Sequence, residues 1–237
     1  MGTLWSEIIT GYTMVVTNDE QMREKLAVSP ALFFREMSLW VQTALPLCSR
    51  PPELQVFLTE GLTQSVYDAA EWVSDQESTG QETVVQTGKT GFSMCSCVIA
   101  QPVGAGDVRL LPYHNFHYDP ETGDVTFPQQ DNAGTEYRLD FYTDGEFLHE
   151  LTPTQKRLVG LAIAVTWDAR FNRNWLNIQP KPHDRNFDMV NENSTMKEST
   201  ARFLKNMAAF NQELGKYEQD CAYMHAVNPY RRVFALI

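Results

Sequence analysis

The residues most capable of chemistry are two cysteines and two histidines in the middle of the chain. Cys95 and Cys97 are separated by one residue. A strand would place both sulfur atoms on one face, because side chains alternate along a strand. His114 and His117 follow in the next strand-like region. Two thiolates and two imidazoles can hold zinc tetrahedrally, and such a site would support a metal-binding or hydrolytic enzyme.

The spacing of these four residues favours a structural role instead. Cys-x-Cys is not a usual zinc-knuckle spacing, and His114 and His117 would face opposite sides of a regular strand. Free cysteines commonly serve as small buried apolar residues. We therefore predict that Cys95 and Cys97 lie in the core, and that the chain has no stoichiometric zinc, no cofactor and no catalytic residue. The enzyme built on these four residues remains the alternative.

An acidic turn suggests a second kind of metal site. Asp119, Glu121 and Asp124 lie in a stretch that also contains proline and glycine, and their oxygen atoms could bind calcium. The stretch lacks the regular acidic comb and the final glutamate of a calcium loop. We therefore predict a turn stabilised by hydrogen bonds from aspartate side chains to the backbone.

A histidine beside an aspartate is the last candidate for acid–base chemistry. His183 and Asp184 are adjacent, and Asp188 and Glu192 follow. No nucleophile elbow, His-Glu-x-x-His sequence or phosphate-binding glycine loop accompanies them. A solvated charged loop is the interpretation that this pattern favours.

Composition narrows the class of protein. The formal net charge is −11, and only 19 lysines and arginines are spread over 237 residues, which argues against nucleic acid as the main partner. No apolar run approaches the roughly 20 residues that span a bilayer, so we expect no membrane association. The first residues do not resemble a secretory signal, and four cysteines are too few for a disulfide framework, so we expect reduced thiols in a cytoplasm.

The first stretch, to about residue 77, has helical patterns. Ser29-Pro30 is a helix start, because serine can cap free amides and proline has no amide to lose. Apolar residues then recur at helical spacing until Pro46 ends the helix near Ala44. We predict a further helix from about Thr63 that carries Val66, Tyr67, Ala70 and Val73.

The middle stretch, from about 78 to 150, is strand-like. Asp144-Gly145 predicts a hairpin that joins Leu139 and Phe141 to Phe147. Other turn signals fall at Gly104–Asp107 and Asp119–Gly123. The runs with strand character are Thr83–Thr87, Phe92–Ala100, Val108–Leu111, Phe116–Tyr118, Asp124–Phe127 and Tyr137–Tyr142.

The last stretch returns to helix. Thr152-Pro153 repeats the cap-and-proline start, and the apolar residues after it surround the predicted helix as far as Trp167, which indicates burial on several sides. A heptad-like row then predicts a helix that packs along another helix. Its members are Phe203, Met207, Phe210, Leu214, Tyr217 and Cys221. The apolar end Val233–Ile237 either docks on its own core or pairs with a neighbouring subunit.

Together these patterns predict an α+β fold, a helical bundle with an inserted small antiparallel β-sheet. Residues 1–77 and 151–237 would form one helical core, and residues 78–150 would form a β-rich insertion, because neither helical flank makes a complete core alone.

The order of these motifs resembles the head–tail adaptor (neck or connector) proteins of tailed bacteriophages. The resemblance covers about two-thirds of the chain and depends on apolar and capping patterns, and the long β insertion departs from it. The stretches that carry it are Leu4–Ile9, Ala44–Cys48, Leu139–Phe147, Leu151–Lys156, Trp167, Trp175-Leu176, Phe187 and a long helix ending near Tyr217.

The resemblance implies a non-enzymatic ring subunit in the neck of the virion, assembled in the host cytoplasm. Its implied partners are the portal protein, tail and neck proteins, and further copies of itself. DNA would pass through the lumen of the ring without sequence-specific binding. An acidic protein suits that role, because a negative lumen does not hold passing DNA.

Overall fold

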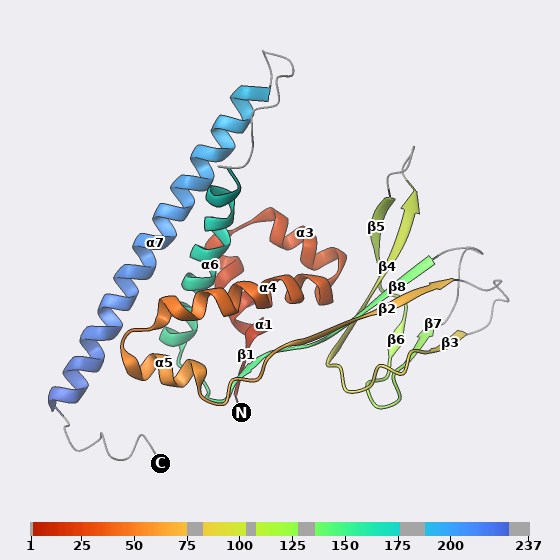
Figure 1. Ribbon diagram of the computed structural model, residues 1–237, viewed down its shortest axis with the longest axis horizontal. Coiled ribbons are helices and arrows are strands. Elements are labelled where there is room, and N and C mark those ends of the chain that lie inside the picture. The colour runs from red at the N-terminus through yellow and green to blue at the C-terminus, as the bar shows by residue number, and fades with distance from the viewer. Residues whose placement is uncertain (1, 75–82, 103–107, 128–135, 176–187, 228–237) are drawn as a thin grey trace. The chain divides into compact units, whose positions relative to one another are not determined.

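The computed structural model describes residues 2–74, 83–102, 108–127, 136–175 and 188–227 (Figure 1). The fold is α+β, as the sequence predicts, with helices and several small antiparallel sheets. The chain divides into two compact units. We call the first, made of Met1–Asn18, Leu39–Leu62 and Phe147–Ile237, the helical unit. The second, made of Asp19–Ser38 and Thr63–Glu146, is the β unit.

This division differs from the expected one at the N-terminal side. Residues from both ends of the chain do lie together in the helical unit. However, Asp19–Ser38, which contains α3 (Glu20–Val28) and the first half of α4 (Pro30–Ala44), groups with the sheets. The start and the end of α4 agree with the signals at Ser29-Pro30 and Pro46.

The predicted helix from Thr63 is wrong, because the structure forms strand β2 there (Val66–Ser74). Tyr67 pairs with Tyr142 and Val73 with Tyr137 of strand β8, with an irregularity between Ala69 and Trp72. Val66, Tyr67, Ala70 and Val73 fit a helical period locally. Pairing with a strand about seventy residues away decides the outcome, which is the usual way that tertiary context overrides local preference.

Two antiparallel sheets make the β unit. The four-stranded sheet has the order β2-β8-β4-β5, and the three-stranded sheet has the order β3-β7-β6. All six predicted strand-like runs are confirmed, with bounds that differ by a few residues. The strands are β3 (Thr83–Gln86), β4 (Met94–Pro102), β5 (Val108–Tyr113), β6 (His117–Tyr118), β7 (Asp124–Phe127) and β8 (Glu136–Thr143).

A compact aromatic core fills the β unit between side chains of both sheets. Phe127 of β7 and Tyr137 of β8 have ring centroids 4.9 Å apart, and Tyr113 of β5 lies 5.1 Å from Tyr137. Leu139, Phe141 and Cys97 are buried in the same cluster. These residues occupy alternate positions on their strands, so one face of the four-stranded sheet makes this core.

Two turn predictions have opposite outcomes. The turn after Asp119 is confirmed: the Asp119 carboxylate accepts bonds from the Glu121 amide at 2.9 Å and the Thr122 hydroxyl at 3.1 Å. The predicted hairpin at Asp144-Gly145 is wrong, because β9 (Glu146–Phe147) pairs with β1 (Thr3–Leu4) near the start of the chain. The turn signal at 104–107 lies outside the described residues.

The helical unit is built around α6 (Pro153–Trp175). Thr152 and Gln155 cap its start reciprocally. The backbone amide of Gln155 donates to the Thr152 hydroxyl at 3.3 Å, and the backbone amide of Thr152 donates to the side-chain oxygen of Gln155 at 2.8 Å. The predicted burial on several sides is confirmed. The buried apolar residues are Leu158, Val159, Leu161, Ala162, Ile163, Ala164, Val165 and Trp167.

The long helix α7 (Asp188–Val227) packs along α6, as its heptad-like row predicts (Figure 1). The two helices run antiparallel. Gln155 donates to the Tyr217 hydroxyl at 2.9 Å near the start of α6, and Arg202 and Asn206 each donate to the Asp168 carboxylate at 2.8 Å farther along α6. These contacts fix the register of α7 against α6.

Short segments complete the helical unit on other sides of α6. Near the N-terminus, α1 (Trp5–Ile8), the π-helical segment η1 (Ile9–Thr13) and α2 (Met14–Thr17) follow one another, and η2 (Leu45–Cys48) and α5 (Pro52–Thr59) follow α4. The Thr13 hydroxyl donates to the Gly160 carbonyl at 3.2 Å. A Cβ atom at Gly160 would lie 2.6 Å from the Tyr12 Cβ, so this close approach requires glycine.

Gly160→Ala should therefore destabilise the protein by about 1–3 kcal/mol, the usual effect of overpacking. Gly215→Ala is the matched control, because a Cβ on this glycine of α7 meets nothing within 4 Å. The control should stabilise by up to about 1 kcal/mol through helix propensity. Urea denaturation of both variants measures these differences, and equal effects would contradict the packing of η1 on α6.

Candidate functional site

The second face of the four-stranded sheet carries a buried polar network. On β8, Tyr137, Leu139 and Phe141 point to the aromatic core, so Arg138 and Asp140 point to the opposite face. Asp140 is fully buried. A buried carboxylate is costly unless it is paired and hydrogen-bonded, so its partners define the site.

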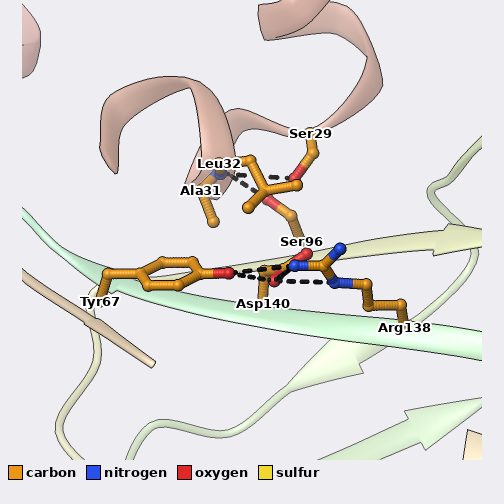
Figure 2. Close-up of polar contacts among 7 residues, drawn as sticks. All are labelled: Ser29, Ala31, Leu32, Tyr67, Ser96, Arg138 and Asp140. Carbon is orange, nitrogen blue, oxygen red and sulfur yellow. Dashed lines mark hydrogen bonds and ion pairs between the residues drawn. The ribbon is translucent and has the colours of Figure 1, made fainter. Parts of the chain in front are cut away.

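One oxygen of Asp140 binds residues of two strands (Figure 2). Tyr67 of the edge strand β2 donates its hydroxyl to Oδ1 at 2.6 Å. Arg138 donates to Oδ1 from Nη2 at 3.0 Å and from Nε at 3.2 Å, and Nη2 also lies 3.2 Å from the Tyr67 hydroxyl. Within the described residues, Oδ2 of Asp140 has no hydrogen-bond partner. The network neutralises the buried charge and joins β2 to β8.

The start of α4 docks on the same face of the sheet. Ser96 of β4 is the cross-strand partner of Asp140, and its Oγ accepts a bond from the Ala31 amide at 2.9 Å (Figure 2). Ser29 caps the same helix, as the sequence predicts, by accepting from the Leu32 amide at 3.4 Å. Two of the free amides at the helix start are thus satisfied, one of them by the sheet.

A second arginine lies at the edge of this network. The guanidinium carbon of Arg35, on α4, lies 4.3 Å from the centroid of the Tyr67 ring. Such stacking is favourable because the face of an aromatic ring carries negative charge. Two arginines therefore contact Tyr67: Arg35 stacks on its ring, and Arg138 donates a hydrogen bond to its hydroxyl.

The electrostatics of the network indicate a structural role. Burial raises the pKa of the Tyr67 hydroxyl, and its hydrogen bond to Asp140 raises that pKa further. Burial lowers the pKa of Arg138, but the charge of Asp140 and the Tyr67 hydroxyl outweigh that effect and raise it overall. Both shifts favour the protonated forms of the two groups, a neutral Tyr67 hydroxyl and a charged Arg138, and these forms donate the hydrogen bonds that connect β2 to β8.

The four residues of the alternative enzyme hypothesis do not converge. Cys97 lies in the aromatic core and Cys95 packs against it, whereas His114 and His117 are exposed. Among the residues with described side chains, no group of three or more His, Cys, Asp or Glu could hold a metal ion. The predicted core position is confirmed for Cys97, whereas Cys95 is partly buried against the same core. The absence of stoichiometric zinc stays a prediction, to be checked by elemental analysis.

Burial also makes these thiols poor nucleophiles. It raises the pKa of the Cys97 thiol to about 12, and it raises the pKa of the Cys95 thiol even more, with a further contribution from Cys97. A thiolate is the reactive form of cysteine, so neither residue is activated. His183 and Asp184 lie outside the described residues, as do the side chains of Asp188 and Glu192.

No protein-family model, curated protein or solved structure matches this chain.

The polar network has one signal in the sequence, which by itself does not predict a buried site. Arg138 and Asp140 alternate with apolar residues in a predicted strand, which places both on one face. That pattern normally indicates a solvent-exposed face. Only the docking of α4 through Ser96 shows that the face is covered.

A double-mutant cycle tests the buried pair. Arg138→Met leaves the Asp140 carboxylate without its charged partner and should cost about 3 kcal/mol, at the lower end of the usual range because about a quarter of the Arg138 side chain is exposed. Adding Asp140→Leu to the Arg138→Met variant removes the unpaired buried charge. The double variant should therefore be more stable than Arg138→Met alone by at least about 1 kcal/mol in urea denaturation. A double variant that is less stable would show that Asp140 stabilises the fold without Arg138.

Thiol reactivity tests the burial of the cysteines. Burial raises the pKa of Cys48 and of Cys97 from the ordinary value of 9.0 to about 12. At pH 8, a thiol reagent should modify the partly exposed Cys221 first and reach Cys48 and Cys97 only on unfolding. Because folding raises these pKa values, their contribution to stability is complete below about pH 9 and is lost as the pH rises towards 12. Rapid native-state labelling of Cys97 would contradict the packing of β4.

Proposed function

We propose that this chain is a structural protein of the virion, a head–tail adaptor whose copies form a ring in the neck between portal and tail. The observation that carries the proposal is the arrangement of α6. It is a buried helix that follows the Leu151-Thr152-Pro153 start, is surrounded by segments from the two ends of the chain, and is followed by a long final helix. This is the order of elements on which the resemblance to head–tail adaptors depends.

The character of the candidate site supports a role in assembly. Asp140, Tyr67 and Arg138 use their polar atoms to bind one another, and their charges balance within the network. Asp168, Arg202 and Asn206 do the same between two helices. Buried polar groups used in this way fix register and geometry, which a ring subunit needs in order to present the same surface in every copy.

The proposed partners follow from this role. They are the portal protein, tail and neck proteins, and further copies of the same chain, with DNA passing through the lumen. The acidic net charge is consistent with a surface that does not retain DNA. None of the helices in the described part of the chain is long and apolar enough to cross a membrane.

The proposal predicts that the chain is a component of purified virions and that it lies at the neck as a ring. In the phage that encodes it, an amber mutation in its gene should give DNA-filled heads and separate tails, because the two cannot join. Electron microscopy and mass spectrometry of the particles measure both outcomes. Tailed, infectious particles that lack the chain would contradict the proposal.

A further inference from the structure

The two units differ sharply in charge. By sequence, the ranges of the β unit contain six lysines and arginines and eighteen aspartates and glutamates, a formal charge of −12. The ranges of the helical unit contain thirteen basic and twelve acidic residues, a formal charge of +1. The acidity of the protein therefore belongs to the β unit, and this unit attracts basic segments of other chains.

Among the described residues, strand β2 is the longest edge strand of the β unit. Edge strands expose unpaired backbone groups, and proteins usually shorten, interrupt or cover them. At the other edge of the same sheet, β5 contains Pro112 and contacts α3. The edge strands β3 and β6 have four and two residues. By contrast, β2 has nine residues and pairs only with β8 among the described strands.

The first half of β2 also exposes apolar surface. Val66 is 53% exposed, and Tyr67 is partly exposed beside Arg35. Neighbouring residues of a strand point to opposite faces, so an added strand at this edge would cover Val66 on one face and Tyr67 on the other. A segment with apolar residues on both of its faces would fit this edge.

The C-terminal end of the chain has the matching composition. After Val227, at the end of α7, the sequence continues with ten residues, and Arg231 and Arg232 precede the apolar run Val233–Ile237. The run is rich in β-branched and aromatic residues, which favour strands. The two arginines complement a unit of charge −12. Ten extended residues reach about 33 Å from the end of α7.

We infer that Val233–Ile237 of one copy adds as a strand to the free edge of β2 of a second copy, with Arg231 and Arg232 held by the acidic β unit. This inference rests on the proposed function in one respect: a tail that enters the next copy makes a head-to-tail contact, and such contacts close into rings. Backbone hydrogen bonds of the added strand supply affinity, and side-chain contacts with Val66 and Tyr67 supply specificity.

A peptide with the sequence of residues 228–237 provides the direct test. It is titrated, with a fluorescent label, into the chain truncated after Val227, and anisotropy reports binding. We expect saturable binding that weakens as salt rises, because the arginines contribute electrostatic attraction. A peptide with N-methyl groups on alternate residues of the apolar run should lose at least about tenfold in affinity, since strand addition requires its amides. Absence of binding, or equal binding of the methylated peptide, would overturn the inference.

Two matched variants locate the receiving edge. Val66→Asp places a charge at the β2 edge and should weaken binding at least about tenfold. Val84→Asp is the control, because Val84 is 54% exposed on the edge strand of the other sheet and the variant adds the same charge to the same unit. Circular dichroism checks that both variants fold. Equal loss in both variants, or loss in Val84→Asp alone, would overturn the assignment to β2.

A mixing experiment tests whether the tail of one molecule reaches the edge of a second molecule. The Val66→Asp chain keeps its tail, and the truncated chain keeps its edge. When they are mixed, sedimentation velocity should detect a one-to-one complex and no larger species, because neither variant has both a tail and an intact β2 edge. Absence of the complex, with the peptide still bound by the truncated chain, would mean that a tail attached to one molecule does not reach the edge of another and would overturn the inference.

These measurements in solution do not require a virion, so they fail independently of the proposed function. If the chain is found in necks and Val66→Asp enters them at the normal level, the inference is wrong and the proposed function stands. If the peptide binds as expected but the chain is absent from virions, the proposed function is wrong and the edge site stands.

Discussion

The burial of α6 is the constraint on which the helical unit depends. A helix with apolar residues all around its circumference cannot face water on any side, so it needs neighbours in several directions. The chain supplies them from distant segments: η1 contacts it at Gly160, Trp40 meets Trp167 with ring centroids 6.1 Å apart, and α7 covers a further side. Residues from both ends of the sequence must therefore come together before this unit has a core.

Each unit combines an apolar core with one buried carboxylate that is paired to an arginine. Asp168 binds Arg202 and thereby fixes α7 against α6, and Asp140 binds Arg138 and Tyr67 and thereby fixes β2 against β8. A buried ion pair adds little stability compared with apolar residues of the same shape, but breaking it is costly. A shift of α7 would separate Arg202 from Asp168, whereas Arg138 and Asp140 share strand β8, so that a shift of β2 would separate only the Tyr67 hydroxyl from Asp140. Both carboxylates therefore help to fix the register of a neighbouring element, a long helix in one unit and an edge strand in the other.

Local signals in the sequence predicted those elements whose ends are set by local chemistry. Ser29-Pro30 and Thr152-Pro153 start helices because their capping bonds involve the next few residues, and the strand-like runs between 83 and 142 keep their alternation. The failures concern partners far along the chain. The apolar spacing within Val66–Ser74 fits a helix, but this segment forms a strand because it pairs with β8. Phe147 does not form the expected hairpin because its strand pairs with β1. Asp140 was missed for the same reason: its neighbours on the strand are known from the sequence, but the helix start that covers it is not.

The charge of the β unit also bears on how such a chain would assemble. Copies that each carry −12 on one unit repel one another over a Debye length of about 8 Å at physiological salt. A sheet edge without a partner is normally a risk of aggregation, and this repulsion weakens non-specific pairing between separate molecules. On the proposed function, a portal that binds several copies raises their local concentration, so that contacts of modest affinity in dilute solution become effectively intramolecular. Like charge and an edge strand are then compatible in one protein, because the charge limits pairing at low concentration and the local concentration on the portal favours it.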